Sequence, residues 1–572
     1  MKFINLRTFF ISFAVFSIGA IFTPFSHATN YRAALPPIIG LLLEDDAAEQ
    51  INMASASRFL MQATYGPTLS EIVALTSSSY EAWIERQFAL PPTNHIDYGR
   101  EIGFFNPGDF PVTNSNARFA VWNQIALNAP DQLRQRMAFA LSQIFVISDR
   151  AEGRHATVTA YYDLLVENAF TSYRDLLEKV TLNQDMGTFL GMAGNQKANI
   201  DLNVLRPDEN FAREVMQLFS IGLVELELDG TPKLDSSGNQ IPTYQQSDVE
   251  ELAKVFTGWH LDFISNATFQ QNRETQFRFN SPMRAFQMYH DVSSKTLLRV
   301  PGFNSVIPPN QTAEQELKQA LDILANHPNT APFISKQLIQ RFVTSNPTPA
   351  YVRRISTVFN STDGNLQAVL KAILLDPEAR RGHIDNPATF GKIKEPILKL
   401  TAFWRAVGFL LNVPPIGPSG RRIDLLEQRP LNAPSVFNFF RPDFSPSGVL
   451  ANSGLLSPES QLLTQTSIVN MGSAFTDFSL ISNQSQNPNN ATFNPIATDQ
   501  LEELVPDNLM RPEALVDHLD LVLLAGTMPD EMREILLNLH SGSQGYAASN
   551  KLTVVNDILY LVTLSPYFNI QR

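Results

Sequence analysis

The chain of 572 residues contains no cysteine. This absence excludes disulfide bonds, thiolate metal sites and cysteine nucleophiles together. A protein without such cross-links must hold its fold by packing, and a chain of this length can bury enough apolar surface to do so.

Charged residues are also scarce, and the positive ones are in the minority. Lys and Arg number 43 against 56 Asp and Glu, for a net charge of -13, and only 17% of the residues are charged. Nucleic acid and anionic lipid would repel such a chain at long range, so the composition argues against both as partners. An apolar content of 44% also argues against wholesale disorder.

Several familiar catalytic motifs are missing. The sequence has no HExxH, GxSxG, Walker or GxGxxG motif, so zincin, α/β-hydrolase and nucleotide-binding functions lack support, and the cofactor stays unknown. There is no haem-attachment motif either. The histidines after residue 28 show no pair with metal-ligand spacing; they are at 95, 155, 260, 290, 327, 383, 518 and 540.

Residues 1–28 have the three parts of a secretory signal peptide. Lys2 and Arg7 precede an uncharged run from Phe9 to Phe22, and the segment ends in Ser26-His27-Ala28. An uncleaved anchor is the alternative, but this run is shorter than the roughly 20 residues that span a bilayer. We therefore expect cleavage after Ala28, a periplasmic or secreted protein, and no integral membrane segment after cleavage.

Beyond the signal peptide the sequence predicts a mainly α protein, a multi-helical body with stacked helical hairpins and a small inserted β-hairpin or sheet. Amphipathic segments separated by Thr330, by Thr348-Pro349 and by Asp363-Gly364 indicate the hairpins. Asp229-Gly230 and Ser237-Gly238, within an alternating stretch, indicate the β-hairpin, and 267–280 is a second alternating patch. The expected parts are a tether at 29–52, a helical core at 53–222, a β-containing insert at about 223–305, a helical region at 306–480, a polar linker at 481–495 and C-terminal helices at 496–572.

Two segments predict buried charge. Residues 131–148 are apolar on nearly every face, which is typical of a central helix, and Arg134, Arg136 and Gln143 within it would need polar partners. Lys392 and Lys394 beside Glu395 would either neutralise a buried carboxylate or form a basic patch.

Six strings together resemble a known family. The combination of ENFAREVMQLFSIG with a following DV and TGW is the most specific, and the resemblance extends from about residue 54 to the C-terminus. It identifies the chain as similar to the exported bacterial family called domain of unknown function 1800. The resemblance implies no agreed activity, but it implies a partner: a second exported family, domain of unknown function 1501, which looks like the sulfatase and alkaline phosphatase fold. The strings are ASRFLMQATYGPT at 56–68, LRQRMAFALSQIFVIS at 133–148, PDENFAREVMQLFSIGL at 207–223, YQQSDVEELAKVFTGW at 244–259, HDVSSKTLL at 290–298 and FGKIKEPI at 390–397.

The segment 208–222 carries the first group of candidate site residues. A helical wheel divides it into an apolar arc and a polar arc, with Pro207 at its start. The simple interpretation is a solvated face with a Glu209–Arg213 pair. The functional interpretation is a cleft wall that binds a metal or a hydroxyl-rich ligand, with Glu209 and Glu214 as catalytic candidates and Asn210, Arg213 and Gln217 as ligand-binding candidates.

Two further candidates flank the next helix. Asp248 precedes the apolar helix VEELAKVF; it is a catalytic candidate, although Ser247 or Asp248 acting as an N-cap is the more ordinary role. Trp259 follows Gly258 at the end of that helix; it would serve as a platform for a sugar or, more simply, pack in the core.

The loop 290–295 has the most reactive combination of side chains. His290, Asp291 and Lys295 bring an imidazole, a carboxylate and an ammonium group within six residues. We take His290 as a catalytic candidate and Asp291 and Lys295 as ligand-binding candidates. The alternative is an ordinary loop in which the aspartate caps a turn.

Two functions remain open from the sequence. The favoured one is an exported accessory or scaffold protein that works with the sulfatase-like partner at the cell surface or helps present polysaccharide. The alternative is an extracellular hydrolase or lyase acting on a carbohydrate polymer, with Glu209, Glu214, Asp248 and His290 in one cleft and with paired carboxylates that suit acid–base work or calcium binding.

The signal-peptide interpretation makes a direct prediction. The mature protein should begin at Thr29 and be recovered outside the cytoplasm. N-terminal sequencing of protein purified from periplasm and culture medium checks this, and recovery of Met1 from a membrane fraction would contradict it.

Overall fold

The computed structural model describes residues 51–105, 115–149, 155–199, 204, 206–262, 281–408, 426–470, 498–541 and 547–572. The signal peptide, nearly all of the tether, the alternating patch at 267–280 and the polar linker at 481–495 lie outside these residues. In the part of the chain that is described, no helix combines the length and the apolar character needed to cross a membrane.

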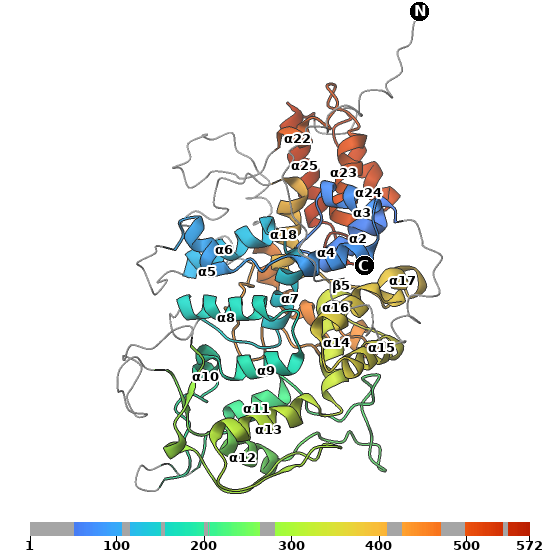
Figure 1. The fold of residues 1–572 in the computed structure, drawn as a ribbon. Helices are drawn as coiled ribbons and strands as arrows, with labels where there is room; N and C mark the ends of the chain where they lie inside the picture. Colours follow the sequence, from blue (N-terminus) through green and yellow to red (C-terminus); the bar gives the residue numbers. More distant parts are fainter. Residues whose placement is uncertain are drawn as a thin grey trace, which may run out of the picture. The chain divides into compact units, whose positions relative to one another are not determined.

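Helices dominate the first half of the chain, and local caps explain where several of them begin. Asn52 and Ser55 cap each other at the start of α2, and Thr68 and Glu71 do the same at α3. These helices (Figure 1) are α2 (Met53–Ala63), α3 (Leu69–Thr76), α4 (Tyr80–Ala89), α5 (His95–Glu101), α6 (Ser115–Asn128), α7 (Gln132–Ser142), α8 (His155–Glu167), α9 (Tyr173–Thr181), α10 (Gln184–Phe189), α11 (Asn210–Gln217) and α12 (Gln246–Val255).

Helix α7 is the central helix that its sequence predicts, since all eleven of its residues are buried. Both of its arginines find partners in backbone carbonyl oxygens, although the Nε atoms of both and Nη1 of Arg136 make no hydrogen bond to a described residue. Arg134 donates to the carbonyl oxygens of Leu90 and Val166, and Arg136 donates to that of Arg341 at 2.6 Å.

The predicted helical hairpins lie between residues 313 and 375. Thr348 caps α15 by accepting a hydrogen bond from the backbone N–H of Tyr351, and Asp363 and Gly364 turn the chain with φ of 51° and 68°. One boundary differs: Thr330 is the first helical residue of α14, and Asn329 occupies the N-cap position. Helices α14, α15 and α16 pack together (Figure 1). The bounds are α13 (Ala313–Ala325), α14 (Thr330–Phe342), α15 (Pro349–Ser361) and α16 (Leu366–Leu375).

Strand structure in the described residues consists of short antiparallel pieces. The predicted hairpin is present: Glu225 N–H donates to the Ile241 carbonyl and Lys233 N–H to the Glu225 carbonyl, with turns at Gly230 and Gly238, whose φ values are 76° and 83°. The protein is therefore mainly α with a small inserted β-structure. The named strand pairs are β1 (Trp259–His260) with β2 (Arg284–Ala285), β3 (Lys295–Thr296) with β4 (Val306–Ile307), and β5 (Lys392–Ile393) with β6 (Ile570–Gln571).

The C-terminal segment packs against the first described helix, α2, and against parts of the chain between residues 342 and 407. Helix α23 contacts both α2 and α18 (Figure 1). The last strand, β6, pairs with β5, and the Gln571 side chain donates to the Phe342 carbonyl at 2.7 Å. The remaining helices are η3 (Gln287–Tyr289), α17 (Pro377–Asp385), α18 (Pro396–Val407), α20 (Val449–Asn452), η4 (Pro458–Leu462), α22 (Asp499–Glu502), α23 (Glu513–Leu524), α24 (Asp530–Asn538) and α25 (Lys551–Leu564).

A buried ionic network joins distant segments around β5. Lys392 Nζ lies 2.9 Å from Glu459 Oε1 and donates to the carbonyls of Gln340 and Arg341. Burial lowers the pKa of Lys392, and the carboxylates of Glu459 and Glu395 oppose that shift. Of the two interpretations of this segment, neutralisation of a buried carboxylate is the one that Lys392 fits.

This network predicts a large stability effect. Glu459→Gln should destabilise the protein by about 3 kcal/mol, because it removes the closest counter-charge from a buried ammonium group. This loss of unfolding free energy should shrink as the pH rises toward 10. The folded-state pKa of Lys392 is lowered, so its amine becomes neutral there and no longer needs a counter-charge. Urea unfolding of both proteins at pH 7 and pH 9.5 measures this.

Asp507→Asn is the matched control, since it also replaces a carboxylate by its amide but acts on the exposed pair with Lys551. This control should leave the unfolding midpoint nearly unchanged. Equal midpoints for Glu459→Gln and the control would contradict the assignment of the network.

Candidate functional site

The residues at the start of α11 form one polar group. Glu209 lies 3.1 Å from Arg213, as the i, i+4 spacing predicts, and it also accepts a hydrogen bond from Gln246 of α12 at 2.8 Å. Arg213 donates to Gln246 in turn. Asn210 donates to the carbonyl of Leu190 at 3.1 Å. These side chains therefore join α11 to its neighbours.

The polar arc of α11 is less open than the helical wheel predicts. The helix spans only Asn210–Gln217, so Pro207 and Asp208 precede it rather than start it. Glu214 is 7% exposed, and Gln217 accepts a long hydrogen bond of 3.4 Å from the hydroxyl of Tyr244. The segment that leads into α12 contacts this arc.

Within the described ranges, Glu214 forms no ion pair with a buried cation. Its Oε2 is buried and accepts no hydrogen bond from a described residue. Burial raises the pKa of Glu214, and the charge of Arg213 opposes this by lowering it. Arg134 and Arg136, the buried arginines of α7, donate instead to carbonyl oxygens.

Asp248 and Trp259 occupy the two ends of α12. Asp248 is at the third position of the helix, three residues after the N-cap residue Gln245, and it closes a capping box by accepting a hydrogen bond from the Gln245 N–H at 2.7 Å. Trp259 is 3% exposed, which suits packing more than a sugar platform.

The loop 290–295 does gather reactive groups, but inside the protein. His290 and Lys295 have no exposed surface, and neither does Glu316 of α13, which they both face. His290 Nδ1 donates to the Thr257 carbonyl at 2.9 Å, and its Nε2 lies 3.2 Å from Glu316 Oε2.

Lys295 is fully satisfied in this cluster. Its Nζ lies 2.8 Å from Glu316 Oε2 and donates to the carbonyls of Asp291 and Ser293, which uses its three N–H groups. Burial alone would raise the pKa of the Asp291 carboxyl group, but hydrogen bonds from Ser293 and the charge of Lys295 lower it. Glu316 was not among the candidates from the sequence. Its place between Ala313 and Ala320 on the apolar stripe of α13 could have indicated that it is buried.

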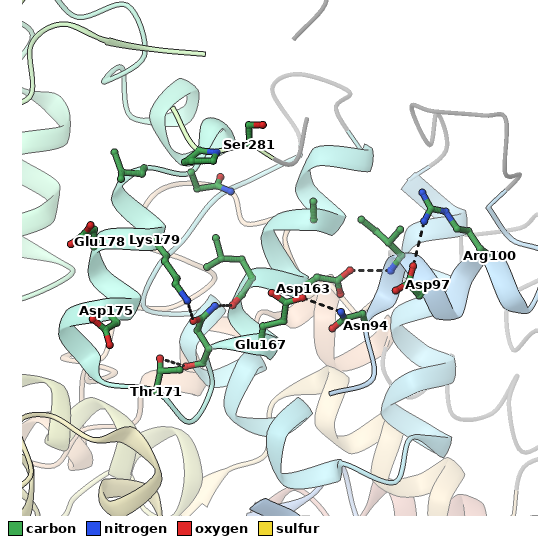
Figure 2. Close-up of a pocket in the computed structure, with 17 residues that line it drawn as sticks. Asn94, Asp97, Arg100, Asp163, Glu167, Thr171, Asp175, Glu178, Lys179 and Ser281 are labelled. Atoms are coloured by element: carbon green, nitrogen blue, oxygen red, sulfur yellow. Dashed lines mark hydrogen bonds and ion pairs between the residues drawn. The ribbon is translucent and has the colours of Figure 1, made fainter. Parts of the chain in front are cut away.

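An open cavity lies elsewhere in the described part of the chain. It has a volume of about 690 Å³ and is formed by α5, α8 and α9 together with residues 281 and 282. Figure 2 shows Asp163 and Glu167 of α8 between Asp97 of α5 on one side and Asp175 of α9 on the other. None of the ten candidates from the sequence lines this groove, nor do they line a smaller cavity of about 350 Å³ beside α9 and α15.

Some of the acidic groups in the groove are engaged by structural contacts. Asp163 accepts from the backbone N–H groups of His95 and Ile96 and thereby fixes the start of α5. Asp97 pairs with Arg100 at 3.3 Å, and Glu178 pairs with Arg174 at 2.7 Å. The carboxylates of Glu167 and Asp175 differ, because neither forms an ion pair with a cation in the described ranges.

Glu167 and Asp175 are therefore the free acceptors of the groove. Glu167 accepts a hydrogen bond only from the side chain of Asn94, at 3.0 Å, among described residues. The carboxylate of Asp175 has no polar partner in the described part of the chain. In the sequence both acids are ordinary residues at helix ends, and nothing there indicates that they line a groove.

Comparison with known proteins identifies the family. The family model described as protein of unknown function, DUF1800, matches residues 58–570. The chain belongs to this family. Comparisons with curated proteins and with solved structures gave no match.

Across the described ranges of this DUF1800 protein, no group of three or more histidine, aspartate or glutamate residues is placed to hold a metal ion.

Glu214 generates a prediction with a defined pH dependence. Burial gives this carboxyl group a higher pKa in the folded state than in the unfolded state, where the pKa is about 4.3. The free energy of unfolding therefore falls as the pH rises from the unfolded pKa through the folded pKa, because the folded state then has to hold an unfavourable charge. Glu214→Gln should therefore melt like the wild type at pH 4 and at a higher temperature than the wild type at pH 7. A lower melting temperature for the variant at pH 7 would show that Glu214 neutralises a buried cation.

Proposed function

We propose that this DUF1800 protein is an exported accessory protein that binds a sulfatase-like exported protein at the bacterial cell surface. The observation that carries the proposal is the open groove of about 690 Å³, in which two carboxylates lack a cation among described residues. A cavity of that volume is typical of binding sites. The partner class comes from the family resemblance.

The position of the candidate catalytic groups supports a binding role over catalysis. The alternative, a carbohydrate hydrolase or lyase, needs Glu209, Glu214, Asp248 and His290 to reach one substrate. His290 has no exposed surface, and Asp248 closes a helix cap on another element. General acid–base catalysis requires that such groups come within hydrogen-bond reach of a substrate.

The groove also suits a protein ligand better than a polysaccharide. Sugar faces stack on aromatic rings, and Tyr and Trp supply such platforms. No aromatic side chain is among the residues that line the groove. Polysaccharide therefore stays the second choice of ligand.

A co-purification experiment tests the accessory role. The tagged protein, expressed in its host and isolated from periplasm and culture medium, should retrieve a sulfatase-like exported protein that an unrelated tagged exported protein does not. Absence of that partner after mild cross-linking would contradict the proposal. Hydrolysis of a polysaccharide by the pure protein, lost in Glu214→Gln, would favour the alternative.

A further inference from the structure

We infer that Arg341 of α14 and the side chains beside it bind a small monovalent anion, a halide or a small carboxylate, inside the protein. This inference does not depend on the accessory role proposed above. It depends on the charge balance of the network around β5, on the hydrogen-bonding groups of Arg341, and on two unpaired amide side chains next to it.

The network around β5 holds more positive than negative charge. Its cations are Arg136, Arg341 and Lys392, and its carboxylates are Glu395 and Glu459, so three minus two leaves one positive charge. All five residues are at most 4% exposed. A surplus charge in a place that nearly excludes water is costly until a counter-charge compensates it.

The two carboxylates are already engaged by other groups. Glu459 pairs with Lys392 at 2.9 Å, and Glu395 accepts hydrogen bonds from two glutamine amides. Among the described residues neither carboxylate forms an ion pair with Arg341. The surplus charge therefore belongs to the arginine side of the network.

Arg341 has no polar partner in the described part of the chain. Its guanidinium group donates no hydrogen bond to a described side chain or carbonyl, and its central carbon lies 4.5 Å from the centre of the Phe440 ring. The face of that ring offsets the charge only in part. Burial lowers the pKa of Arg341, yet a guanidinium group does not lose its proton in proteins. A buried carboxyl group can become neutral by taking up a proton, whereas Arg341 needs a counter-ion.

Part of the guanidinium group still borders open space. The Nε atom of Arg341 is fully enclosed, while its two Nη atoms are neither enclosed nor hydrogen-bonded to a described residue. The residue as a whole is only 2% exposed. So little exposed surface suits an anion of a few atoms rather than a protein segment or a polysaccharide.

Two unpaired amide side chains lie beside Arg341. Gln337 is four residues earlier on α14, which places both side chains on one face of the helix. Asn438 is two residues before Phe440, whose ring contacts Arg341. Gln337 is 7% exposed and Asn438 6% exposed, and neither side chain forms a hydrogen bond with a described residue. An amide can turn its NH2 group toward a ligand without changing its shape, so both can add donors to those of Arg341.

The chemistry of this set selects an anion over water and over a cation. Water would accept hydrogen bonds from the N–H groups but would leave the positive charge uncompensated. A cation would be repelled by Arg341 and by the other two cations of the network. An anion supplies both the acceptor and the counter-charge, and such charge-assisted hydrogen bonds are the strong ones.

Thermal melting in bromide tests the inference. The purified protein is melted in sodium bromide and in sodium gluconate at equal ionic strength, since gluconate is too large for an enclosed site. Saturating bromide should raise the melting temperature of the wild type by about 2 °C. Arg341→Met should lose this rise, because methionine keeps an apolar side chain against Phe440 but has neither the charge nor the N–H groups. A series in sodium formate compares a carboxylate with the halide, and the anion with the larger rise is the better model of the ligand.

Matched variants separate the site from general salt effects. Arg353→Met removes an arginine whose side chain is 61% exposed and pairs with Asp229, so it should keep the rise. Arg341→Lys keeps the charge and loses the planar fork. It should show a smaller rise than the wild type, and it provides the comparison if Arg341→Met does not fold. Crystals soaked in sodium bromide should give an anomalous peak within hydrogen-bond distance of the Arg341 Nη atoms.

Three results would overturn the inference: equal melting of the wild type in bromide and gluconate, an equal rise in the wild type and both Arg341 variants, or bromide peaks at the protein surface alone. The outcome for the accessory role is separate, because Arg341 does not line the groove of the proposed function.

Discussion

The burial of Lys392 is the constraint on which much of the structure depends. An ammonium group inside a protein must have acceptors and a counter-charge, and here these come from Gln340 and Arg341 in α14 and from Glu459 in η4. Glu395 extends the network by accepting from Gln143, the residue that follows α7, and from Gln428. Four segments that are far apart in the sequence are thereby held around β5, which in turn pairs with the last strand of the chain. A protein without disulfides gains from this network a specific arrangement of its helices as well as packing.

The sequence predicts those parts of the fold that local interactions decide. Helix caps such as Thr348, turns such as Asp363-Gly364 and the uniformly apolar character of α7 each depend on residues within one or two turns of one another. The α11 segment shows where this stops. Its wheel places Glu214 on the exposed arc, yet Glu214 is buried because the chain near Tyr244 contacts that arc. Such contacts depend on tertiary packing, and the periodicity of a single helix carries no information about which other segment will cover it.

The same distinction applies to the candidate site. His290 and Lys295 are close in the chain, so the sequence grouped them as candidates. It did not predict that both face Glu316 without exposed surface. The groove was missed for the opposite reason. Glu167 and Asp175 end one helix and begin the next, so each looks ordinary alone, and only the packing of α5 on α8 brings Asn94 beside Glu167. Whether a side chain is exposed, and whether side chains from different helices come together, depends on the folded chain.

The two kinds of ionisable group in this protein have different consequences for function. A buried and fully bonded ion such as Lys295 can change its charge or its partners only at a large cost in stability, because its surroundings offer no water to replace them. An exposed carboxylate such as Asp175 loses little solvation free energy when a cation displaces its water. The attraction between the carboxylate and the cation then lowers the free energy of the complex. Recognition by an acidic protein of this kind is therefore expected at the open groove rather than at the buried clusters of reactive side chains, since the groove presents carboxylates that no described cation neutralises.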